Sequence, residues 1–312
     1  MNKKSKKSRI SKDSILYDII KNKTLYIMLL PVTTYFLIFC YWPMYGVQIA
    51  FKNFNAAKGI MGSPWVGFYH FQRFFRSYNF VTLITNTITL NLYNLVASFP
   101  APIILALLLN EVANSKFKRV VQTVTYAPHF LSTVVVTGML TTLLSPKTGI
   151  VNHLIATLGG ERIYFMGEPA WFKHIYVWSG VWQHTGWSAI IYLAALTSVD
   201  QQQHEAAIID GANKVQRIWY INIPAILPTA IILLILNLGQ IMNVGFEKVF
   251  LLQNDLNLKS SDVISTYVYR MGLLGAQYSF STAVGLFNSV INFILIVVVN
   301  YISRKVSEVS LW

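Results

Sequence analysis

The sequence predicts an all-α polytopic membrane protein with six transmembrane helices. Of its 312 residues, 54% are hydrophobic and only 12% are charged, whereas soluble domains average about 25% charged residues. Six windows contain no Asp, Glu, Lys or Arg, and a membrane-crossing helix needs ~20 such residues. These windows are residues 25–51, 81–110, 120–144, 174–199, 229–246 and 280–303. Their number predicts six crossings in one transmembrane domain over residues 25–312.

The first window, 25–51, is expected to be a retained helix rather than a signal peptide. It is too long for the apolar core of a signal peptide, and no small-residue cleavage site follows it. Cys40 within it is the chain's one cysteine, which excludes an intrachain disulfide and predicts a packing role.

Prolines interrupt the next two windows. Pro100 and Pro102 lie in the second and Pro128 lies in the third, so both helices are expected to kink where a backbone hydrogen bond is lost. The fifth window is the shortest, and we expect its helix to extend through Glu247 and Lys248 to Leu252.

Basic residues give the expected orientation. The segment 1–24 forms a basic tail. Together with the predicted loops 110–120 and 199–228 and the end of the chain, it places 15 of the 25 basic residues on one side. The positive-inside rule therefore places both termini and the loop 199–228 in the cytoplasm. The net charge of +13 is explained as a topology signal beside anionic lipid rather than as a nucleic-acid site. The loops on the other side, roughly 47–80, 145–173 and 253–279, are too short to form a separate recognition domain.

Neutral polar residues recur at membrane depth. They are Asn86, Asn91, Asn94, Gln183, His184, Asn237, Gln240, Asn243, Asn288 and Asn292. Two interpretations stay open: hydrogen bonds between helices, each worth ~1 kcal/mol, or the lining of a path for a ligand rich in hydroxyl groups.

The chain lacks the residues that several classes of protein need for their function. Acidic side chains are absent from every window, which argues against a proton- or sodium-coupled carrier. No phosphate-binding loop, HExxH pair or catalytic triad can be identified. We therefore expect no enzymatic activity, no metal site and no cofactor bound by this chain itself.

The loop 199–228 is the most polar internal segment. Glu205, Asp210, Lys214 and Arg217 would each cost ~2.5–3.5 kcal/mol inside a bilayer, so the loop must lie outside it. Asp200 with Gln203 predicts a capping box that starts a helix over roughly 201–210. Gly211 is the expected stop.

A second short helix is expected over 213–220. Asn213 with Gln216 would cap it, and its apolar face would comprise Val215, Ile218 and Trp219 while Lys214 and Arg217 point elsewhere. Pro224 should end this helix by holding Ile223 out of helical geometry.

These residues resemble the EAA signature of permease subunits of binding-protein-dependent ABC importers. Glu205, Ala206, Ala207, Gly211, Ile221 and Pro224 stand at every required spacing, and only Ile223 departs, replacing the usual Leu. The stretches YAPHFLSTVVVTGML, GWSAIIYLAAL and YSFSTAVGLFNSVINFILI resemble the carbohydrate-uptake, maltose-type branch. In its short external loops and basic N-terminus, the chain resembles the Gram-positive members of this branch that transport complex saccharides.

The resemblance implies the partners and the coupling site. It implies a heterodimer with a second permease, two cytoplasmic ATPases that bind ATP and Mg, an external solute-binding lipoprotein, and a location in the bacterial cell membrane. The implied ATPase-contacting residues are Glu205, Ala206, Ala207, Asp210, Gly211, Val215, Ile218, Trp219, Ile221 and Pro224.

The substrate path has four candidate residues. Aromatic rings stack on sugars and amides bind hydroxyls, so Trp187, Asn237, Gln240 and Asn243 are chosen, the last three on one face of the fifth helix. Because this path is uncharged, it favours a neutral oligosaccharide. The alternatives are an ABC permease for a phosphodiester or a peptide, and, outside that class, a secondary carrier or a membrane sensor.

Overall fold

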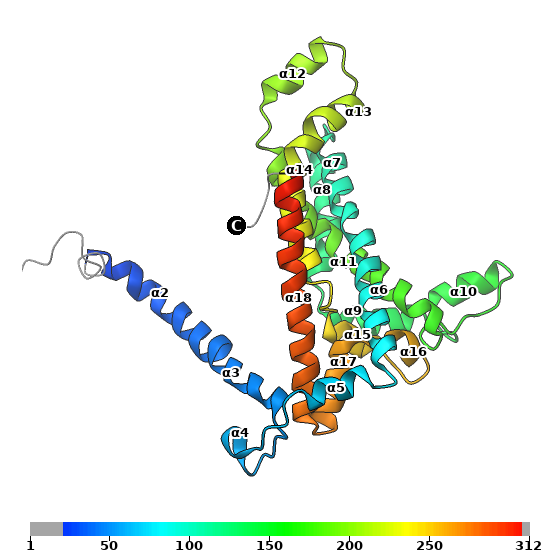
Figure 1. The fold of residues 1–312 in the computed structure, drawn as a ribbon. Coiled ribbons are helices and arrows are strands. Elements are labelled where there is room, and N and C mark those ends of the chain that lie inside the picture. Colours follow the sequence, from blue (N-terminus) through cyan, green and yellow to red (C-terminus); the bar gives the residue numbers. More distant parts are fainter. Residues whose placement is uncertain (1–20, 308–312) are drawn as a thin grey trace, which may run out of the picture.

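The computed structural model describes residues 21–307, and the chain is nearly all helical, as predicted (Figure 1). Residues 1–20 of the predicted basic tail lie outside the described part. The first half comprises α2 (Lys23–Phe36), η1 (Leu37–Tyr41), α3 (Trp42–Met44), η2 (Tyr45–Phe51), α4 (Gly59–Gly62), α5 (Tyr69–Phe75), α6 (Phe80–Ser98), α7 (Pro100–Asn110), α8 (Ser115–Tyr126), η3 (Ala127–Phe130) and α9 (Thr133–Leu143). The second half comprises α10 (Ile150–Thr157), α11 (Pro169–Leu196), α12 (Gln201–Ile209), α13 (Lys214–Arg217), η4 (Ile218–Asn222), α14 (Ile223–Gly239), α15 (Phe246–Leu252), α16 (Leu258–Ser261), α17 (Ile264–Tyr269), η5 (Arg270–Leu274) and α18 (Tyr278–Ser307).

Within residues 21–307, four helices are long and apolar enough to cross a membrane. They are Lys23–Phe51, Phe80–Asn110, Lys214–Gly239 and Tyr278–Lys305. The fourth predicted window coincides with α11, a 28-residue helix whose length suffices for a crossing. The third window is not one helix, because the chain breaks at η3 and bends before α9 begins at Thr133.

The prediction of a single fifth helix through Leu252 is wrong. Helix α14 ends at Gly239, the chain turns, and α15 begins at Phe246. Side-chain amides from other helices hydrogen-bond to backbone groups that this turn leaves without helical partners. Asn91 Nδ2 donates to the Ile241 carbonyl at 2.7 Å, and the Met242 N–H donates to Asn292 Oδ1 at 3.1 Å. The break is stable because neighbouring helices replace the lost helical bonds.

The other backbone breaks are satisfied in the same way. Gln183 Nε2 donates to the Leu131 carbonyl at 2.9 Å, directly after η3. Asn86 Nδ2 donates to the carbonyls of Lys259, within α16, and Asp262, directly after it. For these amides the interpretation as contacts between helices is confirmed.

The expected helix end at Pro224 is also wrong. Ile223 has helical dihedral angles (φ −62°, ψ −48°), and one helix of 26 residues runs from Lys214 to Gly239. A π-helical turn, η4, ends at Asn222, two residues before Pro224. The i→i+5 bonding of such a turn shifts the hydrogen-bond register, so that a residue without an N–H is tolerated there.

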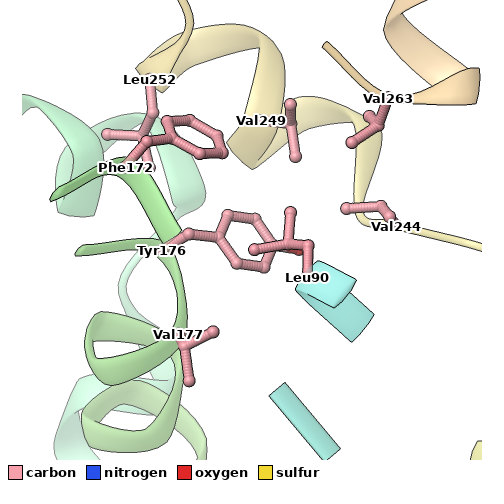
Figure 2. Packing of buried hydrophobic residues seen from close by; sticks show 8 residues of the cluster. All are labelled: Leu90, Phe172, Tyr176, Val177, Val244, Val249, Leu252 and Val263. Atoms are coloured by element: carbon pink, nitrogen blue, oxygen red, sulfur yellow. The ribbon is translucent and has the colours of Figure 1, made fainter. Parts of the chain in front are cut away.

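Apolar clusters join the helices of the body. Figure 2 shows one of them, in which Phe172, Tyr176 and Val177 of α11 meet Val249 and Leu252 of α15. A second cluster joins α7, α11 and α14 near the other end of α11. Its buried members are Ala106, Leu107, Ala189, Tyr192, Leu196, Ile226 and Ala230.

The N-terminal helix stands apart from this body. Figure 1 shows α2 and α3 extending away from the other helices, and no residue of α2 is buried. Cys40 in η1 is exposed, so its predicted packing role within this chain is not found. An apolar helix exposed on all sides is suited to lipid or to a second membrane protein.

Candidate functional site

The polar loop forms a helical hairpin that projects from one end of the helix bundle (Figure 1). Its helices are α12 and α13, and the turn between them contains Gly211 at φ +81°. The expected left-handed stop is therefore confirmed. The Asp200–Gln203 capping box is not formed: Asp200 caps α12 by accepting from the Gln202 N–H at 2.9 Å. Asp200 remains the N-cap, but an Asx turn replaces the reciprocal box.

The capping box of the second helix is confirmed. The Gln216 N–H donates to Asn213 Oδ1 at 2.9 Å, and the Asn213 N–H donates to Gln216 Oε1 at 2.8 Å. Because α13 has only four residues before the π-helical turn, this box fixes where the helix starts.

The predicted apolar face of the second helix is divided between two surroundings. Ile218 packs against the cluster that joins α7, α11 and α14, whereas Val215 and Trp219 are 62% and 63% exposed. Ile208 and Ile209 of α12 are exposed as well. The hairpin therefore presents an apolar surface that this chain does not cover, as protein interaction sites do.

The other signature residues follow the same division. Glu205, Ala206, Asp210, Gly211 and Pro224 are exposed, while Ala207 and Ile221 are half-buried. Because Ala206 and Ala207 have small side chains, another protein can approach closely beside the Glu205 carboxylate.

A residue that the sequence reasoning missed anchors this hairpin. Glu111, directly after α7, lies 3.8 Å from the Arg217 guanidinium and accepts from Asn222 Nδ2 at 3.4 Å. Asn222 is fully buried, and Arg217 turns inward rather than toward solvent. The sequence signal for Glu111 was a lone carboxylate at the end of a charge-free window. Its partners, Arg217 and Asn222, could be identified only from the tertiary structure.

Two cavities lie between the membrane helices. The larger, about 380 Å³, is lined from α6, α7, α11 and α14 by residues that include Asn94, His184, Trp187 and Asn237. The smaller, about 130 Å³, is lined by residues that include Asn94, Asn237, Gln240 and Asn243. The four predicted path residues thus all line a cavity, and Asn94 and Asn237 line both.

The predicted common helix face is wrong, however. Gln240 is the C-cap of α14 and Asn243 lies beyond the helix end. The turn after Gly239 returns these side chains to Asn237, and Asn243 Nδ2 donates to Gln240 Oε1 at 2.5 Å. Tertiary structure, not helical periodicity, brings them together.

Aromatic groups hold one wall of the larger cavity. The Trp187 indole stacks on the His129 imidazole with centroids 4.6 Å apart and an interplanar angle of 3°. His129 Nδ1 is 3.2 Å from His184 Nδ1. No group of three His, Cys, Asp or Glu residues that could hold a metal is found within the described residues.

Comparison with known proteins gives independent evidence on the family of this chain. The family model for the inner membrane component of binding-protein-dependent transport systems matches residues 84–308. Protein LplB of Bacillus subtilis is 47% identical over 292 residues, which cover 94% of this chain and 92% of that protein. The polygalacturonan/rhamnogalacturonan transport system permease protein YteP of the same organism is 44% identical over 310 residues, 99% of this chain and 95% of that protein.

A comparison with solved structures points to the same class of protein. A bacterial ABC transporter involved in the import of the acidic polysaccharide alginate matches with a TM-score of 0.87 and 43% identity over 94% of this chain and 99% of that chain. The family match covers most of the chain, and the relatives are similar over nearly their whole length. The chain therefore belongs to the family of inner membrane components of binding-protein-dependent transport systems.

Proposed function

We propose that this chain is a permease subunit of an ATP-driven importer that takes up an oligosaccharide. The observation that carries the proposal is the projecting hairpin of α12 and α13, whose Glu205 and Ala206 are exposed at one end of the helix bundle. The relatives include YteP, a permease protein for polygalacturonan and rhamnogalacturonan transport. Two cavities between the membrane helices, each lined in part by asparagine amides, support a hydroxyl-rich ligand.

The proposed topology has six crossings with both termini and the hairpin in the cytoplasm. The basic residues support this orientation through the positive-inside rule. Its geometry agrees with Figure 1, where α4, α5, α10 and α16, from the segments assigned to the outside, lie toward the end opposite the hairpin. Crossings three and four would be the broken α8–α9 segment and α11.

The proposed assembly has five polypeptides: this chain, a second related permease, two cytoplasmic ATPases and an external binding lipoprotein. ATP and Mg would be bound by the ATPases alone. A similar solved structure is an alginate ABC transporter in complex with its alginate pentasaccharide-bound periplasmic protein. The exposed apolar surface of α2 is available to lipid or to the second permease.

The continuous helix Lys214–Gly239 suggests how ATPase movement reaches the path. Its first residues form the exposed α13, and its last turns carry Asn237 into both cavities. At 1.5 Å per residue, this helix is about 40 Å long. Movement of the ATPase against α13 would tilt the same helix that lines the cavities. Alternation between two packings is the general means by which such transport proceeds.

Reconstitution tests the function. The complete importer, expressed with its neighbouring permease, ATPase and binding protein, should hydrolyse ATP in proteoliposomes faster when one oligosaccharide of a panel is added. Glu205→Ala should reduce this stimulation without dissociating the complex, because its side chain is exposed rather than part of the folded core. Failure of the chain to associate with any ATPase would contradict the proposal.

The path residues give a separate prediction. Asn237→Ala combined with Gln240→Ala should reduce oligosaccharide uptake about tenfold, because each lost hydrogen bond contributes about 0.5–1.5 kcal/mol. The measurement is initial uptake of labelled sugar into proteoliposomes. Asn79→Ala is the matched control, since Asn79 is exposed and makes no capping hydrogen bond. Uptake equal to that of the control would remove these residues from the path.

A further inference from the structure

Lys248 is a cation held within the helix bundle. It lies on α15, whose Val249 and Leu252 pack against Phe172 and Tyr176 in the cluster of Figure 2. This packing fixes α15 against α11, so that the side chain of Lys248 reaches α11. Lys248 Nζ donates to the Tyr176 carbonyl at 2.9 Å and lies 5.0 Å from the centroid of the Tyr176 ring. The ammonium group therefore has a defined position well inside the ends of α11.

That position is at the wall of the larger cavity. A Cβ atom added to Gly180 would lie 3.3 Å from Lys248 Nζ and 3.9 Å from Asn94 Oδ1. Gly180 and Asn94 both line the cavity of about 380 Å³. The absence of a side chain at Gly180 thus gives the ammonium group room beside the cavity.

The charge of Lys248 has no counter-ion in the described part of the chain. The ion pairs within residues 21–307 are Arg217 with Glu111 and Arg270 with Asp262. An ammonium group has three donors, and the one hydrogen bond found uses the carbonyl on the α11 side. Enclosing an unpaired cation is costly, and ionisable residues inside a membrane bundle mark ligand pathways by default.

We propose that Lys248 binds a carboxylate of an acidic oligosaccharide during import, and so selects uronate-containing substrates. The inference rests on the proposed function and names the substrate class of that path. It replaces the neutral sugar expected from an uncharged path. The ammonium group supplies the charge, and the nearby amide of Asn94 and indole of Trp187 are available to hydroxyl groups and a sugar face. A similar solved importer acts on the acidic polysaccharide alginate.

The test uses the complete reconstituted importer and two trisaccharides of the same length, trigalacturonate and neutral galactotriose. Lys248→Met keeps an unbranched side chain of similar size and removes its charge, whereas Lys248→Arg keeps the charge. All variants are measured with the same binding protein, so that its own selectivity cancels. We expect Lys248→Met to lower trigalacturonate uptake about tenfold or more, since hydrogen bonds to charged groups are the stronger class, and Lys248→Arg to retain most of it.

The outcomes separate the inference from the function. Wild-type importer that takes up galactotriose and not trigalacturonate would overturn the carboxylate site while leaving oligosaccharide import intact. Equal loss of both sugars in Lys248→Met would show a structural role and would also overturn it. Gly180→Ala is a second variant that keeps the charge and crowds Nζ, and we expect a selective loss of trigalacturonate uptake. An importer that assembles and hydrolyses ATP but responds to no sugar would instead contradict the proposed function.

Discussion

Gly211→Val is expected to reduce substrate-stimulated ATP hydrolysis and sugar uptake at least tenfold while the membrane helices remain folded. Gly211 has φ +81° in the turn between α12 and α13. A residue with a Cβ pays about 1–2 kcal/mol in this left-handed region, and a β-branched residue more. Because the hairpin projects from the bundle, the turn is expected to relax by reorienting α12 against α13. The surface offered to an ATPase would then be lost.

The measurement compares ATP hydrolysis with and without substrate in reconstituted complexes. No atom lies within 4 Å of a Cβ built at Gly211, so the effect comes from the backbone and not from a clash. Gly211→Asn is the matched control, since Asn tolerates left-handed geometry, and it should retain most of the stimulation. Wild-type coupling in Gly211→Val would show that the turn geometry is not required.

Gly186→Leu is expected to prevent assembly of a folded permease. Helices α8 and α11 cross at Gly186 so closely that a Cβ would overlap the carbonyl group of Thr125. The clash is with backbone, which cannot rotate away. The segment that follows α8 is also tied to α11 on either side of Gly186, because Gln183 bonds to the Leu131 carbonyl and Trp187 stacks on His129. Overpacking costs about 1–3 kcal/mol even against side chains, and separation of two helices adds the loss of both contacts.

Detergent-solubilised protein should show this effect as a loss of the monodisperse peak in size-exclusion chromatography. Gly285→Ala on α18 is the control, since a Cβ there meets nothing within 4 Å and alanine favours a helix by about 0.5–1 kcal/mol over glycine. It should give normal yield and an equal or higher unfolding temperature. A Gly186→Leu protein with the wild-type elution profile would show that α8 and α11 can separate.

The sequence by itself determined the class of the fold and part of the local structure of the polar loop 199–228. Long charge-free windows can only be buried in lipid or among helices, so composition sufficed for an all-α membrane protein. Two features of this loop could also be predicted, because they are local. Gly211 takes its positive φ for steric reasons, and the Asn213 box joins residues three positions apart. Such interactions depend on neighbours along the chain, which the sequence lists directly.

Tertiary structure alone decided where the membrane helices break and which side chains meet. The end of α14 at Gly239 depends on amides from α6 and α18, and the helix through Pro224 depends on a π-helical turn. For the same reason the pairing of Glu111 with Arg217 and the place of Lys248 beside Gly180 could not be read from spacing. Inside a membrane every polar group must find a partner, and those partners stand far away in the sequence. Their choice is made by helix packing.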